Sequence, residues 1–195
     1  MPFALVIDTA PTRLLLTLEE AKSHLSIAEG CPCDSLDIER RIAEATADAE
    51  RECGRQFVSA TWLMYLDDFP RDGEPIRLPL GKTSAVSSVK YYDADGVQQT
   101  LPTSVYFAAI QGEPARLSLK LGQVWPQVHY GRPEAVEIEY VVGWATPEAV
   151  PADIKAAVKL ILGERWANRG DGKEDRSIPA GARRILTAWR AHEVG

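Results

Sequence analysis

The chain has 195 residues, 45% of them hydrophobic and 26% charged, which is the composition of a globular protein long enough to bury its own core. A formal net charge of −6 argues against nucleic-acid binding through a basic patch, since neutralising phosphates takes clustered lysines and arginines. Residues 1–7 have no basic segment, and no apolar run approaches the length of a bilayer span. We therefore expect a soluble protein made in the cytoplasm, with no membrane partner.

Residues 1–56 are expected to form the N-terminal helical part of the fold. Thr17-Leu18-Glu19-Glu20 is a capping box, in which the Thr17 hydroxyl accepts from the Glu20 backbone and the Glu20 carboxylate reaches back. A second helix is predicted from about Ser35, ended by Gly54. Its apolar face is expected to carry Leu36, Ile42, Ala45, Ala49 and Cys53.

Residues 57–145 change to the period and composition of short strands. Runs of β-forming residues recur between prolines and glycines, and Asp95-Gly96 between two such runs predicts a hairpin. Glu137 and Glu139 alternate with apolar neighbours, which is typical of the solvent face of a strand. This part is therefore expected to be an inserted β-rich region.

Helical spacing returns after residue 145. Residues 146–176 are expected to supply a helix that completes the bundle, followed by a polar, glycine-rich loop. Residues 177–195 are expected to form a short last helix, opened near Pro179. The chain as a whole predicts an α+β fold, a helical bundle of two N-terminal and two C-terminal helices with a central inserted β-rich region of antiparallel strands.

Cys31 and Cys33, with His24 upstream, are the strongest candidates for a metal site. A structural zinc site needs four ligands, with roughly two to four residues between paired cysteines. One residue separates Cys31 from Cys33, no second pair exists, and Cys53 suits the apolar face of its helix. We expect free thiols in an ordinary loop, no metal and no cofactor. A metal-stabilised module or enzyme around Cys31, Cys33 and His24 is the alternative.

The carboxylates and tryptophans give no strong enzyme signal. Asp93 and Asp95 suit a turn, and the motifs of phosphate-binding loops, serine hydrolases and zinc proteases are missing. We expect the chain not to be an enzyme. Trp125, beside Pro126 in a predicted loop, suggests a carbohydrate-binding module as a second alternative, although core or subunit contact is the commoner role of tryptophan.

The last helix is the segment that most suggests a protein partner. It combines an apolar edge, formed by Ile185, Leu186 and Trp189, with three basic residues, Arg183, Arg184 and Arg190. Two interpretations stand at this point. The helix docks on its own domain, or it inserts into a groove on another protein, anchored by tryptophan and arginine.

Several segments occur in an order and spacing that resemble a known family. They are LTLEEAKSHL (16–25), AERECGRQF (49–57), TWLMYLDDFP (61–70), IRLP (76–79), VSSVKYYDADG (86–96), WP (125–126), VVGW (141–144) and VPADIK (150–155). None is specific alone, and their shared order carries the likeness from about residue 15 to residue 190. The chain resembles the phage head–tail connector (adaptor) proteins of long-tailed phages, prophages and gene transfer agents.

The resemblance implies a structural subunit of a homo-oligomeric ring, a dodecamer, between the portal protein and a stopper or tail-completion protein. It places the chain at the head–tail junction of a phage-like particle assembled in the host cytoplasm. DNA would pass through the ring without specific binding, which suits copies that each carry a net charge of −6. The last helix would reach into the portal. Its six residues named above then form the predicted portal-binding set, and removing residues 177–195 is expected to spare the bundle and abolish portal binding.

Overall fold

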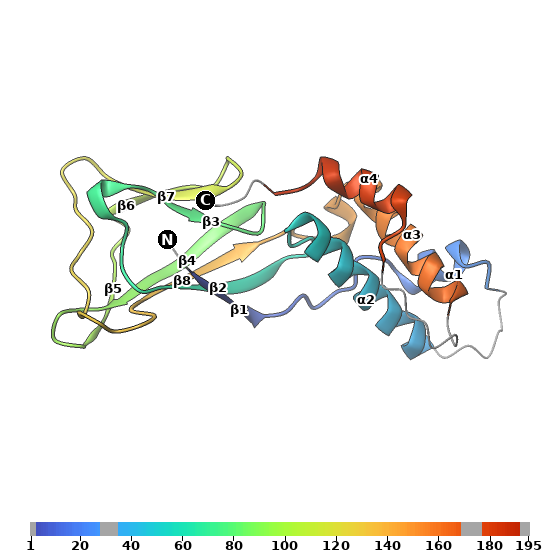
Figure 1. Cartoon of the computed structure of the whole chain (residues 1–195), viewed down its shortest axis with the longest axis horizontal. Coiled ribbons are helices and arrows are strands. Elements are labelled where there is room, and N and C mark those ends of the chain that lie inside the picture. The colour runs from blue at the N-terminus through green and yellow to red at the C-terminus, as the bar shows by residue number, and fades with distance from the viewer. Residues whose placement is uncertain (1–2, 28–34, 169–176, 192–195) are drawn as a thin grey trace. The chain divides into compact units, whose positions relative to one another are not determined.

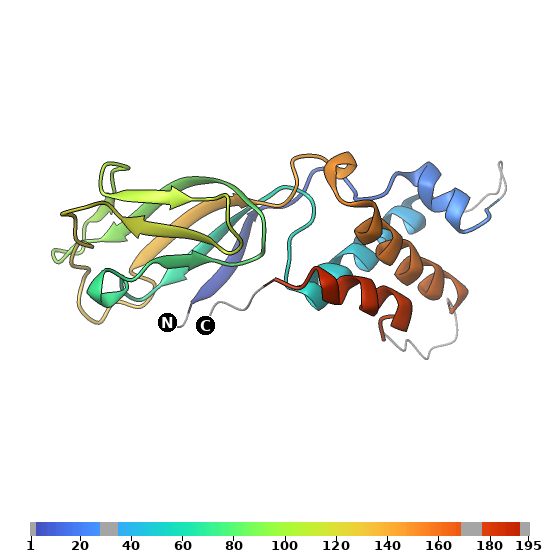
Figure 2. The same cartoon turned by 90° about the horizontal axis from the view of Figure 1, so that it is seen from above.

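The fold is described from a computed structural model of the chain (Figures 1 and 2), in which residues 3–27, 35–168 and 177–191 are described. These residues form an α+β structure with helices and antiparallel sheets. The chain divides into two compact units. The β unit contains the residues up to Ala10 together with Ser59–Gly143, and the helical unit contains Pro11–Val58 and Trp144–Arg190.

The β unit is a pair of antiparallel sheets with a shared core. One sheet has the order β1-β2-β8-β4-β5 and the other the order β3-β7-β6 (Figure 1). Apolar residues from both sheets form one buried cluster, so the sheets pack face to face. The strands are β1 (Ala4–Thr9), β2 (Ala60–Leu66), β3 (Ile76–Leu78), β4 (Thr83–Tyr92), β5 (Gln98–Thr100), β6 (Tyr106–Ala109), β7 (Ala115–Leu119) and β8 (Val136–Val142), with a 3₁₀ turn, η1, at Arg71–Gly73.

The predicted hairpin and strand alternation are confirmed. β4 and β5 pair in register, and Gly96 has a φ of 78°, the left-handed conformation that this tight turn requires. In β8 the buried residues alternate with half-buried ones, among them Glu137 and Glu139. These two glutamates therefore lie on the outer face of the five-stranded sheet, away from the core.

The expectation that residues 1–56 are helical is wrong at its start. Ala4–Thr9 forms strand β1, which pairs antiparallel with β2 and places Leu5 opposite Met64. This stretch is too short and too rich in β-branched residues for a stable helix, and its partner lies more than fifty residues away in the sequence. Local periodicity does not reveal such a long-range pairing.

The helical unit packs four helices in its described part around one apolar cluster. They are α1 (Leu18–His24), α2 (Ser35–Cys53), α3 (Ala152–Ala167) and α4 (Ala180–Ala188), with a 3₁₀ turn, η2, at Pro147–Ala149. The capping box is confirmed, since the Glu20 amide donates to Thr17 Oγ1 at 3.1 Å and the Thr17 amide donates to Glu20 Oε2 at 2.9 Å. No helix in the described ranges is long and apolar enough to cross a membrane.

The buried face of α2 differs from the prediction at one position. Ile42, Ala45, Ala49 and Cys53 are buried as expected, but Leu36 is 71% exposed. Ile38 takes the core position instead, because it lies four residues before Ile42 and thus on the same face of the helix.

Candidate docking surface on the last helix

α4 places two residues of one face in the core of the helical unit. Ala182 and Leu186 are fully buried and lie four residues apart, so they share the face that packs on α2 and α3. Ile185 is half-buried against the same cluster. The apolar side chains of α4 therefore pack on their own unit, as the first of the two interpretations of this helix states.

Trp189 follows the last residue of α4 and is held by three neighbours. Its indole Nε1 donates to Asp153 Oδ2 at 2.7 Å, and its ring meets Trp144 edge to face with a centroid distance of 6.1 Å. Arg55 lies over the ring at 5.9 Å and donates from Nε to the Trp189 carbonyl. Trp189 is therefore an anchor between α4 and the rest of its own bundle.

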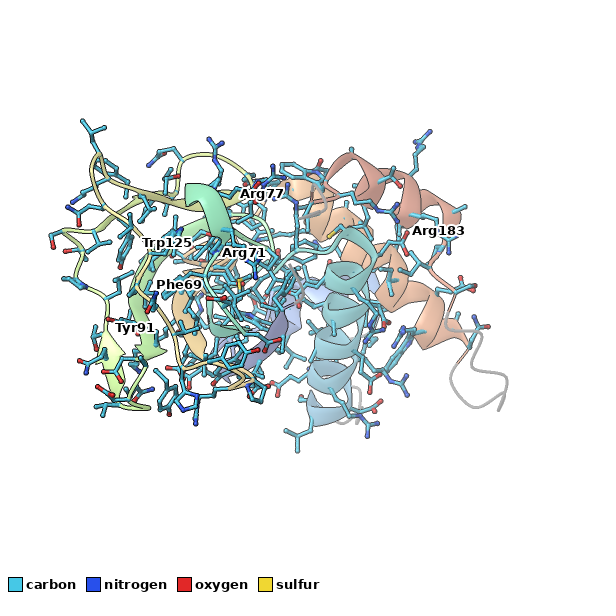
Figure 3. All side chains as sticks on the ribbon, turned by 60° about the vertical axis from the view of Figure 1, so that its left-hand side comes forward. Phe69, Arg71, Arg77, Tyr91, Trp125 and Arg183 are labelled. Atoms are coloured by element: carbon cyan, nitrogen blue, oxygen red, sulfur yellow. The ribbon has the colours of Figure 1, made fainter. Side chains whose placement is uncertain are left out.

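The arginines of α4 and its end are the exposed members of the predicted set. Arg183 and Arg190 both approach Glu52 Oε1, at 3.8 Å and 3.5 Å, and keep 55% and 59% of their side chains exposed. Exposed pairs of this kind stabilise little. Arg184 is exposed and forms no salt bridge within the described part of the chain (Figure 3 shows the neighbouring Arg183). The exposed side of α4 is therefore basic rather than apolar.

A half-buried carboxylate, that of Glu50, holds the segment that leaves α2. Glu50 Oε1 accepts the Phe57 amide at 2.7 Å and the Gln56 side-chain amide at 2.8 Å. Burial raises the pKa of Glu50 to about 7, although the hydrogen bond from Phe57 acts in the opposite direction. Sequence reasoning missed Glu50, because nothing local distinguishes it from the other glutamates of the same helix.

The described residues do not form the metal site that the sequence left as an alternative. Cys31 and Cys33 lie outside the described residues, while His24 is exposed at the end of α1. Within the ranges described, no group of three metal-ligating side chains occurs. Cys53 is buried, its Sγ lies 3.1 Å from the Ala49 carbonyl, and burial raises the pKa of its thiol to about 11, so it is not an activated nucleophile.

Trp125 does not offer two free faces to a sugar. Its ring stacks on Phe69 with a centroid distance of 5.0 Å and an interplanar angle of 2° (Figure 3), and its Nε1 lies 3.4 Å from the Glu74 carbonyl. Phe69 in turn belongs to the core of the β unit. Trp125 is half-buried, so its contact with the core accounts for one face of the ring.

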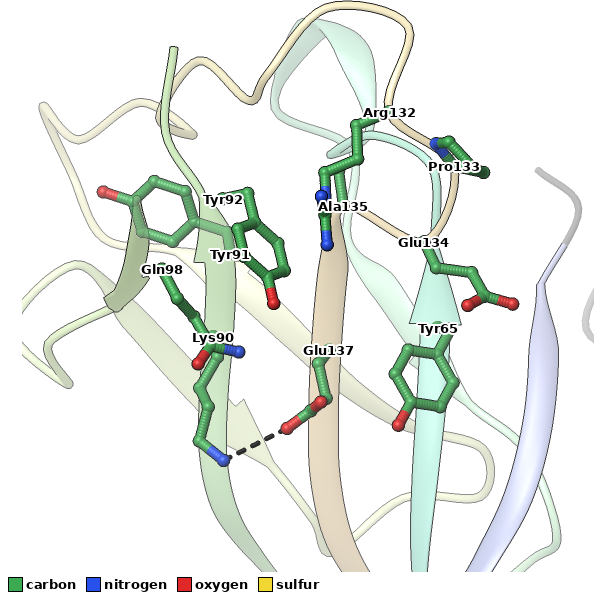
Figure 4. Close-up of a pocket in the computed structure, with 10 residues that line it drawn as sticks. All are labelled: Tyr65, Lys90, Tyr91, Tyr92, Gln98, Arg132, Pro133, Glu134, Ala135 and Glu137. Atoms are coloured by element: carbon green, nitrogen blue, oxygen red, sulfur yellow. Dashed lines mark hydrogen bonds and ion pairs between the residues drawn. The ribbon is translucent and has the colours of Figure 1, made fainter. Parts of the chain in front are cut away.

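The carboxylate pairs have structural partners. Asp93 accepts the amides of Asp95 and Val97 within the hairpin, and a hydrogen bond from the Gln99 side chain is the main cause that lowers its pKa. Glu137 forms a salt bridge of 3.1 Å with Lys90 beside a cavity of about 170 Å³ (Figure 4). These contacts fit a turn and a sheet surface rather than acid–base catalysis.

Comparison with solved structures shows that chains of gene transfer agent particles share this fold. No protein-family model matches the sequence, and no curated protein matches it. A chain in the neck of an empty gene transfer agent particle, computed with C6 symmetry, aligns with a TM-score of 0.80 at 24% identity, covering 98% of this chain and 97% of that chain.

Two further structures show the same likeness. A chain in the virion of a native gene transfer agent particle aligns with a TM-score of 0.79 at 24% identity, over 97% of this chain and 96% of that chain. A chain in the neck of a native particle, computed with C12 symmetry, aligns with a TM-score of 0.76 at 23% identity, over 98% and 97%. The resemblance drawn from the sequence is thus confirmed at the level of the fold.

Proposed function

We propose that the chain is a structural, non-enzymatic head–tail connector subunit in the neck of a phage-like particle. It forms a ring between the portal protein and a stopper or tail-completion protein, and DNA passes through the ring. The observation that carries the proposal is the likeness to a neck chain over nearly the full length of both, which includes the β unit as well as the helical one. A shared helical bundle alone would be a much weaker argument.

A dodecamer is the proposed ring. Neck structures with this fold were computed with C6 and with C12 symmetry, and a ring of twelve is compatible with both. Closed rotational symmetry is the usual solution for one chain that binds its own copies head to tail. The net charge of −6 on each copy keeps the ring from holding DNA by general electrostatic attraction.

The contact with the portal is proposed to involve the basic surface of α4. Arg183, Arg184 and Arg190 are exposed, whereas Ile185, Leu186 and Trp189 fix the helix on its bundle. The proposed portal-binding role therefore belongs to the arginines, with the three apolar residues as their support. Arginine suits such a contact because its planar guanidinium binds carboxylates through two parallel hydrogen bonds.

Portal binding tests this assignment. Arg184→Glu should weaken binding of the purified chain to the portal ring by about tenfold or more, since it reverses a charge that faces the partner. Arg51→Glu is the matched control, because Arg51 is 77% exposed on α2 and undergoes the same charge change. If the two variants bind the portal equally well, the proposal that α4 binds the portal is wrong. If the chain is missing from purified particles by mass spectrometry, the connector function itself is wrong.

A further inference from the structure

Two arginines stand opposite each other on the outer face of the three-stranded sheet. Arg77 of β3 and Arg116 of β7 are register partners, and both are exposed while their strand neighbours are buried. Directly opposed side chains in an antiparallel pair have Cβ atoms only about 5 Å apart, and like charges at that spacing are unfavourable. Neither guanidinium forms a salt bridge with a carboxylate in the described part of the chain. This pair is called the arginine face (Arg77 is labelled in Figure 3).

The surroundings of the arginine face favour a protein partner. Small side chains, Ala109 and Ser118, flank it on the same side of the sheet. Phe107 of β6 is 60% exposed on this side, and the Lys120 ammonium lies 4.9 Å from the centre of its ring. Arginine and aromatic side chains are enriched at protein interfaces. Two arginines on a chain of net charge −6 are a poor site for a phosphate backbone.

The same unit carries a cavity with complementary charge. It has a volume of about 620 Å³ and lies between the end of β2 and the loop that precedes β8. Asp67 and Asp68 line it, and the Glu134 amide donates to Asp67 Oδ1 at 2.9 Å, which brings a third exposed carboxylate close by. None of the three carboxylates forms a salt bridge with a described residue. Asp67, Asp68 and Glu134 are called the acceptor carboxylates.

The two surfaces belong to different parts of the β unit. The arginine face belongs to the outer side of the three-stranded sheet. Arg132 and Pro133 line both the large cavity and the smaller one beside Lys90 and Glu137, which lies on the outer side of the five-stranded sheet (Figure 4). The outer sides of two packed sheets point away from each other. Within one chain no salt bridge joins the arginine face to the acceptor carboxylates among the described residues, whereas two neighbouring copies can bring them together.

We infer that the arginine face of one copy binds the acceptor carboxylates of the next copy in the ring, an inference that rests on the proposed function. Contacts that close a cyclic ring join two different surfaces of the same chain, and these two surfaces meet that requirement. The contact gives each guanidinium a carboxylate partner and relieves the repulsion between Arg77 and Arg116. Phe107, beside the arginines, adds apolar area at the rim.

Cross-linking in assembled particles tests the contact. Arg77→Cys and Asp68→Cys are combined in a chain that also carries Cys31→Ser and Cys33→Ser, and purified particles are treated with a short bismaleimide. The inference predicts a ladder of covalent multimers of this chain, while each single cysteine variant gives none. If the chain is present in the particles but no ladder forms, the inference is wrong and the proposed function is not affected. A chain missing from the particles overturns the proposed function.

Exchanging the charges of the two surfaces tests whether the arginine face binds another copy of this chain. Arg77→Glu with Arg116→Glu should lower incorporation into particles by about tenfold or more, as should Asp67→Arg with Asp68→Arg. The four changes together should restore incorporation to within about threefold of wild type, because the partner surface is on another copy. If the combined variant stays as low as its parents, the arginine face binds something else, such as DNA or another neck protein, and the inference is wrong.

Discussion

Glu50 shows how burial gives one residue of the helical unit a pH dependence. Its pKa rises from the ordinary 4.5 to about 7 in the folded chain, mainly because burial disfavours the carboxylate. Between these pH values the folded state binds a proton that the unfolded state has lost. The stabilisation from this group is therefore complete below about pH 4.5 and is lost as the pH rises through about 7.

Glu50→Gln should remove this dependence. The glutamine carbonyl still accepts the Phe57 amide but does not ionise, so the wild-type chain should lose on the order of 1 to 2 kcal/mol relative to the variant between about pH 5 and about pH 8. Urea unfolding at the two pH values measures the difference. Equal pH dependence in both chains would show that Glu50 is not the responsible group.

Single substitutions distinguish the buried side of α4 from its exposed side. Leu186→Ala should lower the free energy of unfolding by about 2 to 5 kcal/mol, because it leaves a cavity at a fully buried position. Arg184 is exposed, so Arg184→Ala should change the free energy of unfolding by less than about 0.5 kcal/mol. Thermal and urea unfolding give both values. A small effect of Leu186→Ala would mean that α4 detaches readily from its bundle.

The hairpin between β4 and β5 depends on a glycine at its turn. Gly96 has a φ of 78°, and a Cβ added there would lie 3.4 Å from His129 Cδ2. Gly96→Ala should therefore destabilise the β unit by about 1 kcal/mol. Gly112→Ala is the control, since nothing lies within 4 Å of a Cβ at that position. Equal unfolding midpoints for the two variants would contradict the argument.

Removal of the last helix has a different expected result once its packing is known. The sequence suggested that a chain without residues 177–195 keeps its bundle and loses only portal binding. Ala182 and Leu186 are fully buried, so the deletion uncovers the apolar surface of α2 and α3. We predict a loss of several kcal/mol in the helical unit, visible as a lower unfolding midpoint. An unchanged midpoint would support the original expectation.

Elements with a local signal were predictable from the sequence, and elements fixed by distant partners were not. The capping box at Thr17 and the turn at Asp95-Gly96 are encoded within a few residues. Strand β1 and the exposure of Leu36 depend on where the chain folds back. For the same reason the sequence identified Trp189, Arg183 and Arg190, but not Asp153, which accepts from the Trp189 indole, or Glu52, which lies near both arginines.

At the scale of the whole molecule, the two units carry separate proposed tasks. The helical unit presents α4 to the portal, and the β unit binds the next copy through the arginine face. Composition alone indicated an acidic globular chain, and only the order of its segments pointed to a ring. The opposed Arg77 and Arg116 were invisible in the sequence, because they lie thirty-nine positions apart and meet only through the pairing of β3 with β7.

The most direct test of the connector function is a cryo-EM map of the neck of purified particles that contain this chain. We predict a closed ring between the portal and the tail-completion protein, into which both the helical unit and the β unit fit, with twelve copies related by symmetry. Particles from cells lacking the gene should then have heads without joined tails. A ring at this position built from another chain, or intact tailed particles without this one, would contradict the account.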